Sequence, residues 1–231
     1  IMADIMENIK RVVDGDTFYT DDKKVRIGNI NTPESVHQND DYNTPEGEAA
    51  SQFAKDVMPA GSQVTVHNYG NDHYGRTVGG LTRNINGVDV DYGLVALDQQ
   101  MSTYYTRYGE HPDPMKHEQY KEYYSKKIPY QFGTSEEFPT PEEMKSVTEL
   151  QEKFSKTYSD FKNGDATQDE LDAVTAELYG NPEQVMKYRR ALVHSKFQEN
   201  SSNANTLAGA MALAMKDNPE LVAQYNRAVR N

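Results

Sequence analysis

Strand-like alternation of apolar residues is confined to the part of this chain before Pro141, and this distribution restricts the fold more than any other feature. We expect strands at residues 7–13, 17–20, 25–30, 64–66 and 77–85. One helix, beginning at Pro45, lies between the third and fourth strands, and further helices follow the fifth. Five strands with a helix at this position are more typical of a small closed barrel of the oligonucleotide/oligosaccharide-binding (OB) type than of a sandwich. We therefore expect an α+β fold built on a five-stranded OB barrel.

Turn and cap residues mark the boundaries of these elements. Residues 14–16, Asp-Gly-Asp, predict a turn between the first two strands, where glycine is able to adopt a positive φ. Thr44 and Pro45 provide the N-cap and the first-turn proline of a helix over residues 45–57. After the fifth strand we expect a helix at 88–98, an extended segment at 101–108 and a helix at 115–127.

The character of the sequence changes near Gly133. Four helix starts are marked beyond it: Thr140-Pro141, Thr167 with Glu170, Asn181-Pro182 and Asn218-Pro219. We find no strand-like alternation in this part, so we divide the chain into an OB barrel domain at 1–133 and an all-helical domain or arm at 134–231. The apolar run at 206–215 is too short to cross a membrane and fits a buried helix or a surface for a protein partner.

Composition limits the classes of function. The chain has 36 acidic and 24 basic side chains and a formal net charge of -12, so we expect any contact with nucleic acid to be local. Cysteine is absent, which excludes disulfides and thiolate metal ligands. No apolar run approaches the roughly 20 residues of a membrane span, and we expect a soluble chain that does not contact a membrane. The start at Ile1-Met2 suggests a trimmed product, which leaves localisation open.

Polar side chains gather where the third strand ends, at Pro33. Asn31, Thr32 and Glu34 offer an amide, a hydroxyl and a carboxylate, and Arg26 projects from the same strand. These groups suit a phosphate and a metal ion. Each also has an ordinary structural explanation, since exposed arginines are commonly solvated or ion-paired and such strand ends are commonly turns. The evidence for a functional site is therefore their combination.

Other candidates are weaker. The six histidines include no pair at the i, i+4 spacing of a helical zinc site, which argues against a zinc enzyme. The tyrosines between Tyr104 and Tyr130 could stack on bases, although core and surface roles are commoner. A basic patch on one expected helix is either a solvated face or a second contact with nucleic acid; it comprises Lys187, Arg189, Arg190 and Lys196.

Four motifs, taken in order, resemble the staphylococcal nuclease (thermonuclease) family over residues 10–132. They are Val13-Asp14-Gly15-Asp16-Thr17, Arg26 with Thr32-Pro33-Glu34, the helix of residues 45–57, and Asp72-His73-Tyr74-Gly75-Arg76. The helix containing residues 117–119 also looks like the last helix of that family. No single motif is specific, but their order and spacing together are. Nothing after Gly133 resembles the family.

The resemblance implies a metal-dependent endonuclease that cleaves both DNA and RNA with little sequence preference and leaves 3'-phosphate ends. It implies a Ca²⁺ ion, with Mg²⁺ as an alternative, bound by Asp16 and by the backbone carbonyl of Thr32. Asn31 takes the place of a further ligand. Hard cations of this kind prefer oxygen ligands, which agrees with the implied set.

The resemblance also implies the catalytic and substrate-binding residues. Glu34 would hold or deprotonate the attacking water, and Arg26 and Arg76 would grip the phosphate, whose developing negative charge needs positive partners. Tyr74 and one of Tyr104 or Tyr105 would contact the nucleotide.

Asn31 departs from the family pattern, which has Asp at this position. An amide oxygen still coordinates Ca²⁺, but the lost charge weakens the site. The acidic net charge is a second departure. The alternative hypothesis is therefore a catalytically weak or inactive nuclease-like module that binds or scaffolds, docked through its helical arm into a larger assembly such as a phage particle.

Overall fold

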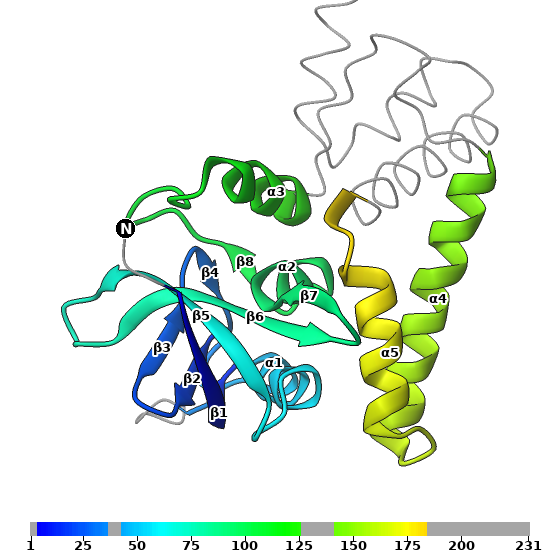
Figure 1. Ribbon diagram of the computed structural model, residues 1–231, viewed down its shortest axis with the longest axis horizontal. Coiled ribbons are helices and arrows are strands. Elements are labelled where there is room, and N and C mark those ends of the chain that lie inside the picture. The colour runs from blue at the N-terminus through cyan, green and yellow to red at the C-terminus, as the bar shows by residue number, and fades with distance from the viewer. Residues whose placement is uncertain (1–3, 37–42, 126–140, 184–231) are drawn as a thin grey trace, which may run out of the picture.

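A computed structural model describes residues 4–36, 43–125 and 141–183 of the chain (Figure 1). The expected boundary at Gly133, the basic patch at residues 187–196, the apolar run at 206–215 and the helix start at Asn218 lie outside these residues. None of the described helices combines the length and the apolar character needed to cross a bilayer.

Eight strands form the β-structure of the described residues. They are β1 (Ile5–Asp14), β2 (Thr17–Thr20), β3 (Lys24–Ile27), β4 (Ile30–Asn31), β5 (Gln63–Asn71), β6 (Thr77–Ile85), β7 (Val88–Asp91) and β8 (Thr103–Tyr104). The main sheet has the order β3-β2-β1-β5-β6-β7, and parallel pairing between β3 and β6 closes it into a five-stranded barrel. β7 extends the sheet beyond β6, and β4 pairs with β8 in a separate two-stranded ribbon. The predicted OB barrel is thus confirmed.

Five helices accompany the barrel: α1 (Pro45–Val57), α2 (Tyr92–Asp98), α3 (Pro114–Ser125), α4 (Pro141–Asn163) and α5 (Gln168–Tyr179). Helix α1 begins as expected, because the Thr44 side chain accepts a hydrogen bond from the Gly47 amide. Helix α5 begins with the predicted capping box between Thr167 and Glu170.

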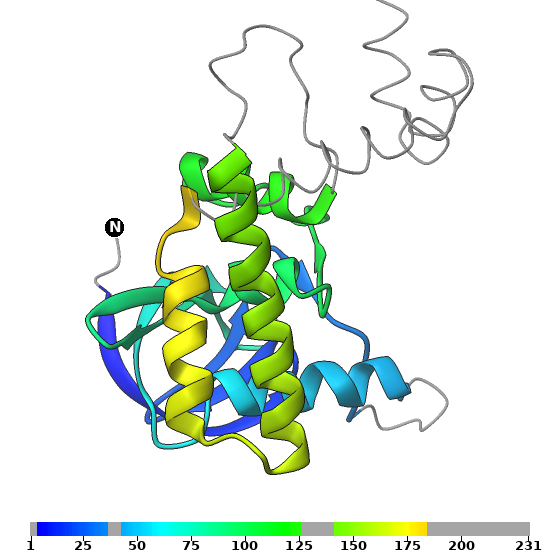
Figure 2. The ribbon, with the colours of Figure 1, turned by 90° about the vertical axis from the view of Figure 1, so that its right-hand side faces the viewer.

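Helices α4 and α5 form an antiparallel pair beside the barrel (Figures 1 and 2). Their apolar side chains Phe154 and Leu171 are fully buried in the same cluster as Phe53 of α1 and Leu81 of the barrel strand β6. Between the two parts, Arg83 of β6 donates two hydrogen bonds to the Asp172 carboxylate, at 2.7 and 2.6 Å. The described part of the helical region therefore shares one hydrophobic core with the barrel.

Three local expectations were wrong. The strand expected at 25–30 is divided into β3 and β4 by a turn at residues 28 and 29, where Asn29 adopts a positive φ. Residues 88–91 form strand β7 before helix α2 begins, because Val88 and Val90 alternate along a strand and Asp91 caps the helix. Gly15 does not have a positive φ. Glycine is required there for space, since a Cβ atom at this position would lie 2.8 Å from the side chain of Thr32 and 2.9 Å from that of Ala50.

Candidate active site

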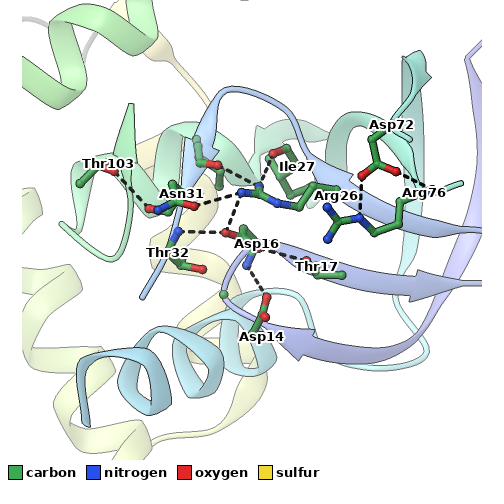
Figure 3. A network of polar contacts seen from close by, with 12 residues as sticks. Asp14, Asp16, Thr17, Arg26, Ile27, Asn31, Thr32, Asp72, Arg76 and Thr103 are labelled. Carbon is green, nitrogen blue, oxygen red and sulfur yellow. Dashed lines mark hydrogen bonds and ion pairs between the residues drawn. The ribbon is translucent and has the colours of Figure 1, made fainter. Parts of the chain in front are cut away.

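A cleft of about 680 Å³ lies at one side of the barrel, between the β1–β2 turn, β3 and the loops that contain residues 72–76 and 105–112. Seven of the predicted site residues line it: Asp16, Arg26, Asn31, Glu34, Tyr74, Arg76 and Tyr105. Segments separated by up to 89 positions therefore meet in one place. Figure 3 shows Asp16, Arg26, Asn31 and Arg76 of this set with their polar contacts.

Arg26 is held by four acceptors (Figure 3). Its Nη1 atom donates to the backbone carbonyls of Ile27 and Ile30, at 2.7 and 2.8 Å. Its Nη2 atom lies 3.2 Å from Oδ2 of Asp16 and 3.3 Å from Oδ1 of Asn31. The two Nη1 hydrogen bonds are short and fix the guanidinium group. The two Nη2 contacts are longer, so this edge of the guanidinium group is held more weakly.

Asp16 sits in the turn after β1 and is only 5% exposed. Its Oδ1 atom accepts a hydrogen bond from the Thr17 hydroxyl at 3.0 Å, and its Oδ2 atom accepts one from the Thr32 amide at 2.9 Å. This second bond joins the β1–β2 turn to the end of β4. Thr32 itself is buried and does not line the cleft.

Asp14 adds a second carboxylate beside Asp16. Burial and the neighbouring charge of Asp16 raise the pKa of Asp14 to about 7, with a smaller contribution from Glu34. Asp14 is therefore only about half ionised at neutral pH, and Arg26 contacts Asp16, the neighbouring carboxylate.

Glu34 is exposed and lines the cleft just after β4. Its backbone carbonyl accepts a hydrogen bond from the Thr44 amide at 3.0 Å. The first turn of α1 packs tightly behind it, since a Cβ atom on Gly47 would lie 2.0 Å from the Glu34 carbonyl oxygen. The start of α1 therefore fixes the backbone that carries the Glu34 carboxylate.

Arg76 also lines the cleft, immediately before β6. Its Nε atom donates to Oδ2 of Asp72 at 2.7 Å, and the Asp72 Oδ1 atom accepts from the Arg76 and Tyr74 amides at 2.9 and 3.0 Å. Partial burial alone would raise the pKa of Asp72, but these hydrogen bonds outweigh it and lower the pKa. Asp72 is thus the group that shapes the loop and orients Arg76.

The predicted tyrosines occupy different positions. Tyr74 is 74% exposed at the rim, with the Arg76 guanidinium 5.4 Å from its ring centroid. Tyr105 lines the cleft. Tyr104 does not line it, because its hydroxyl contacts His117 and its ring packs against Tyr120 of α3. Of the two alternatives, Tyr105 is the one that faces the cleft.

Other cleft residues, among them Asn29 and Tyr69, were not predicted from the sequence. Tyr108 also lines the cleft, and it is one of the tyrosines between Tyr104 and Tyr130 that could stack on bases. Asp72 and Arg76 stand opposite each other across the β5–β6 turn, so their opposite charges were a visible signal for the ion pair. Tyr69 lies near the end of β5 and offered no such signal.

The donor types at Asp16, Asn31 and Thr32 fit a hard cation, because all three offer oxygen atoms. Their number and charge predict weak binding, since the set has one carboxylate, an amide and a backbone carbonyl. In the part of the chain that the structure describes, no three His, Cys, Asp or Glu residues are grouped so as to hold a metal ion. The side-chain oxygens of Asp16 and Asn31 also face Arg26.

A closed five-stranded barrel with two arginines and a carboxylate cluster in one cleft defines a nuclease-like OB-fold domain. The family model described as staphylococcal nuclease homologue matches residues 24–126, so this segment is a domain of the staphylococcal nuclease family. The match covers β3 to α3 and includes six of the seven predicted residues that line the cleft. A comparison with curated proteins gave no match.

Proposed function

We propose that this chain hydrolyses phosphodiester bonds in DNA or RNA with little sequence preference. One observation carries this proposal: Arg26, Glu34 and Arg76, from three separate segments, line the same cleft. A phosphodiester that enters this cleft would meet two guanidinium groups and the carboxylate of Glu34. These are the groups that hydrolysis by an in-line water requires.

The two arginines would bind the phosphate and stabilise the charge that develops on it. Guanidinium groups suit this task because they offer several N–H donors in a plane. Arg76 is held through Nε by Asp72, which leaves its Nη atoms to point away from that bond. Arg26 would exchange its long contacts with Asp16 and Asn31 for phosphate oxygens, while its short bonds to Ile27 and Ile30 keep it in place.

Glu34 would orient and deprotonate the water. Its side chain is exposed in the cleft, so its carboxylate is accessible to a water molecule, and its backbone is fixed by α1. A positioned general base of this kind contributes roughly 10²–10⁴-fold to a reaction rate.

Asp16, Asn31 and the Thr32 carbonyl would hold a Ca²⁺ ion, or Mg²⁺ in its place. Such an ion supplies positive charge that polarises the phosphate. Because Asn31 contributes no charge, we expect a low affinity. Asp16 would keep its hydrogen bond to the Thr32 amide with or without the ion, so the β1–β2 turn would stay joined to the end of β4.

Tyr74 and Tyr105 would contact the bases. Aromatic rings stack on any base, which explains why low sequence preference is expected. The acidic chain provides little long-range attraction for nucleic acid, so substrate binding should be weak.

Plasmid cleavage tests this proposal. The purified chain should cut supercoiled DNA in Ca²⁺ or Mg²⁺ and should stop when a chelator is added. Glu34→Gln and Arg76→Gln should lose the activity, and Asn86→Asp, on the remote β6–β7 hairpin, should retain it. Metal-independent cleavage, or full activity in the two cleft variants, would contradict the proposal.

The second candidate is a nuclease-like binding module that has lost catalysis. It is favoured by one observation, the contact of Arg26 with both Asp16 and Asn31, the side chains that would otherwise ligate the ion. Under this hypothesis the wild-type chain binds oligonucleotide without cutting it, and Asn31→Asp restores cleavage. If neither protein cuts DNA or RNA, the nuclease proposal is wrong.

A further inference from the structure

The turn between β3 and β4 contains a residue in an unusual conformation. Asn29 has φ of 63°, in the left-handed region, where asparagine is among the few side chains tolerated. It follows Arg26 by three positions and lines the cleft.

Three hydrogen bonds join Asn29 to a distant segment, residues 105–109. Its Nδ2 atom donates to the backbone carbonyl of Gly109 at 2.8 Å and to that of Tyr105 at 3.2 Å. Its own carbonyl accepts a hydrogen bond from the Tyr105 amide at 2.8 Å. The left-handed conformation makes this possible, because it lets one residue present its amide group and its carbonyl to the same loop.

Arg26, a candidate catalytic residue, also holds the turn between β3 and β4. Arg26 donates through Nη1 to the carbonyls of Ile27 and Ile30, the residues that flank the apex of the turn. Asn29 therefore stands between the guanidinium expected to bind phosphate and the loop that carries the aromatic wall of the cleft.

That loop also has a turn hydrogen bond of its own, from the Gly109 amide to the Thr106 carbonyl at 3.0 Å. Tyr105 and Tyr108 both line the cavity, and their rings pack edge to face with centroids 6.0 Å apart. Tyr108 is 79% exposed, so packing alone does not define its position. The hydrogen bonds from Asn29 hold the backbone at both ends of the segment that carries the two tyrosines, at Tyr105 and at Gly109.

We propose that Asn29 is a positioning residue that holds the tyrosine segment 105–109 against the phosphate site and so determines how tightly a nucleotide base is bound next to the phosphate. The inference rests on the proposed function, since it assigns the tyrosine segment to the base of the same substrate. Asn29 acts through the two tyrosines and does not itself take part in the reaction.

Two substitutions separate the hydrogen bonds from the backbone conformation. Asn29→Gly keeps the positive φ without strain and removes both side-chain bonds. Asn29→Asp keeps the shape but turns a carboxylate toward two carbonyls, so it should be the more damaging variant. The matched control is Asn86→Gly, because Asn86 also has a positive φ, of 54°, in the exposed β6–β7 turn away from the cleft.

Cleavage of two single-stranded oligonucleotides tests the inference, one intact and one with an abasic residue beside the scissile phosphate. For Asn29→Gly we expect KM for the intact strand to rise roughly tenfold, as two lost hydrogen bonds imply, with kcat changed less than about threefold. The abasic strand should already have a high KM in the wild type, and Asn29→Gly should add little. Equal effects on both strands, or no effect beyond that of Asn86→Gly, would overturn the inference.

Amide hydrogen exchange provides a readout that does not depend on activity. In Asn29→Gly the amides of residues 105–109 should exchange faster than in the wild type, while those of β5 and β6 stay unchanged. If the wild-type chain cuts no nucleic acid, the proposed function fails and exchange alone decides the role of Asn29. Unchanged exchange in the loop would then refute it.

Discussion

The Nη2 atom of Arg26 lies 3.2 Å from Oδ2 of Asp16, while its Nη1 atom is anchored to two backbone carbonyls. Lysine cannot reproduce this arrangement, because an ammonium group lacks the planar fork. We expect Arg26→Lys to lower kcat by roughly 10²–10³-fold on a single-stranded oligonucleotide. Arg11→Lys is the control, since Arg11 is exposed and stacks on Tyr19 at 4.3 Å, and it should leave kcat unchanged. Equal kcat values in the two variants would count against a role for the Arg26 guanidinium.

The close contact between Gly47 and Glu34 predicts the effect of a single methyl group. Alanine normally stabilises a helix relative to glycine, by about 1 kcal/mol. In Gly47→Ala the new Cβ would lie 2.0 Å from the Glu34 carbonyl oxygen, so Glu34 or the first turn of α1 must move. We expect a fall in kcat and no gain in the free energy of unfolding. The exposed neighbour Glu48 provides the control Glu48→Ala, and a stabilised, fully active Gly47→Ala would show that the contact is unimportant.

His111 predicts a loss of stability in acid. Burial lowers its pKa to about 4, and the ammonium of Lys116 acts in the same direction, whereas the carboxylates of Asp91 and Asp113 oppose it. Between the ordinary pKa of 6.5 and about 4, the unfolded chain binds a proton at this site that the folded chain does not. The free energy of unfolding should therefore fall as pH decreases through this range, by on the order of 1–3 kcal/mol.

Chemical denaturation at a series of pH values, compared with His111→Asn, checks this expectation. Asparagine retains an oxygen near the position where Nδ1 accepts the Asp113 amide, at 3.0 Å, but it does not titrate. The variant should be less stable at pH 7 because the packing is lost, and its stability should decline less between pH 6.5 and 4. Parallel curves for the two proteins would assign the acid sensitivity to other groups.

The ion pair between Arg83 and Asp172 predicts that α4 and α5 stabilise the barrel. Both side chains are 14% exposed, so Asp172→Ala leaves a largely buried guanidinium without its carboxylate and should cost roughly 2–4 kcal/mol. The control lies on the same helix, because Glu177 pairs with Lys153 at an exposed position, and Glu177→Ala should cost at most about 1 kcal/mol. A single cooperative transition in denaturant is expected; a separate transition for the helical part would show independent folding.

The sequence predicted the parts of the fold that depend on local signals. Thr44 with Pro45, and Thr167 with Glu170, mark helix starts through contacts three residues apart, and both starts were found as predicted. Strand β7 was missed because it is only four residues long and leads directly into helix α2. The apolar residues of 88–98 therefore looked like one helix, although they belong to a strand and a helix. The shared core of barrel and helices was invisible, because contacts such as Arg83 with Asp172 join residues 89 positions apart.

Some residues of the candidate site could likewise be predicted from the sequence, and others could not. Arg26, Glu34 and Arg76 were found because they belong to ordered motifs next to strand ends. The sequence could not choose between Tyr104 and Tyr105, since adjacent residues on a strand point to opposite sides and the register was not visible. Asn29 was missed because its partners, the carbonyls of Tyr105 and Gly109, are backbone atoms that leave no trace in side-chain patterns.

The most direct test of a nuclease centre in this cleft is the turnover of Glu34→Gln on a saturating single-stranded oligonucleotide in Ca²⁺, with its affinity for the strand measured in parallel. Glutamine keeps the shape of the side chain and removes the base, so kcat should fall at least about 10²-fold while the Kd for the strand stays within about threefold. Cleavage at the wild-type rate by this variant would contradict the assignment of Glu34, and with it the catalytic centre described for this cleft.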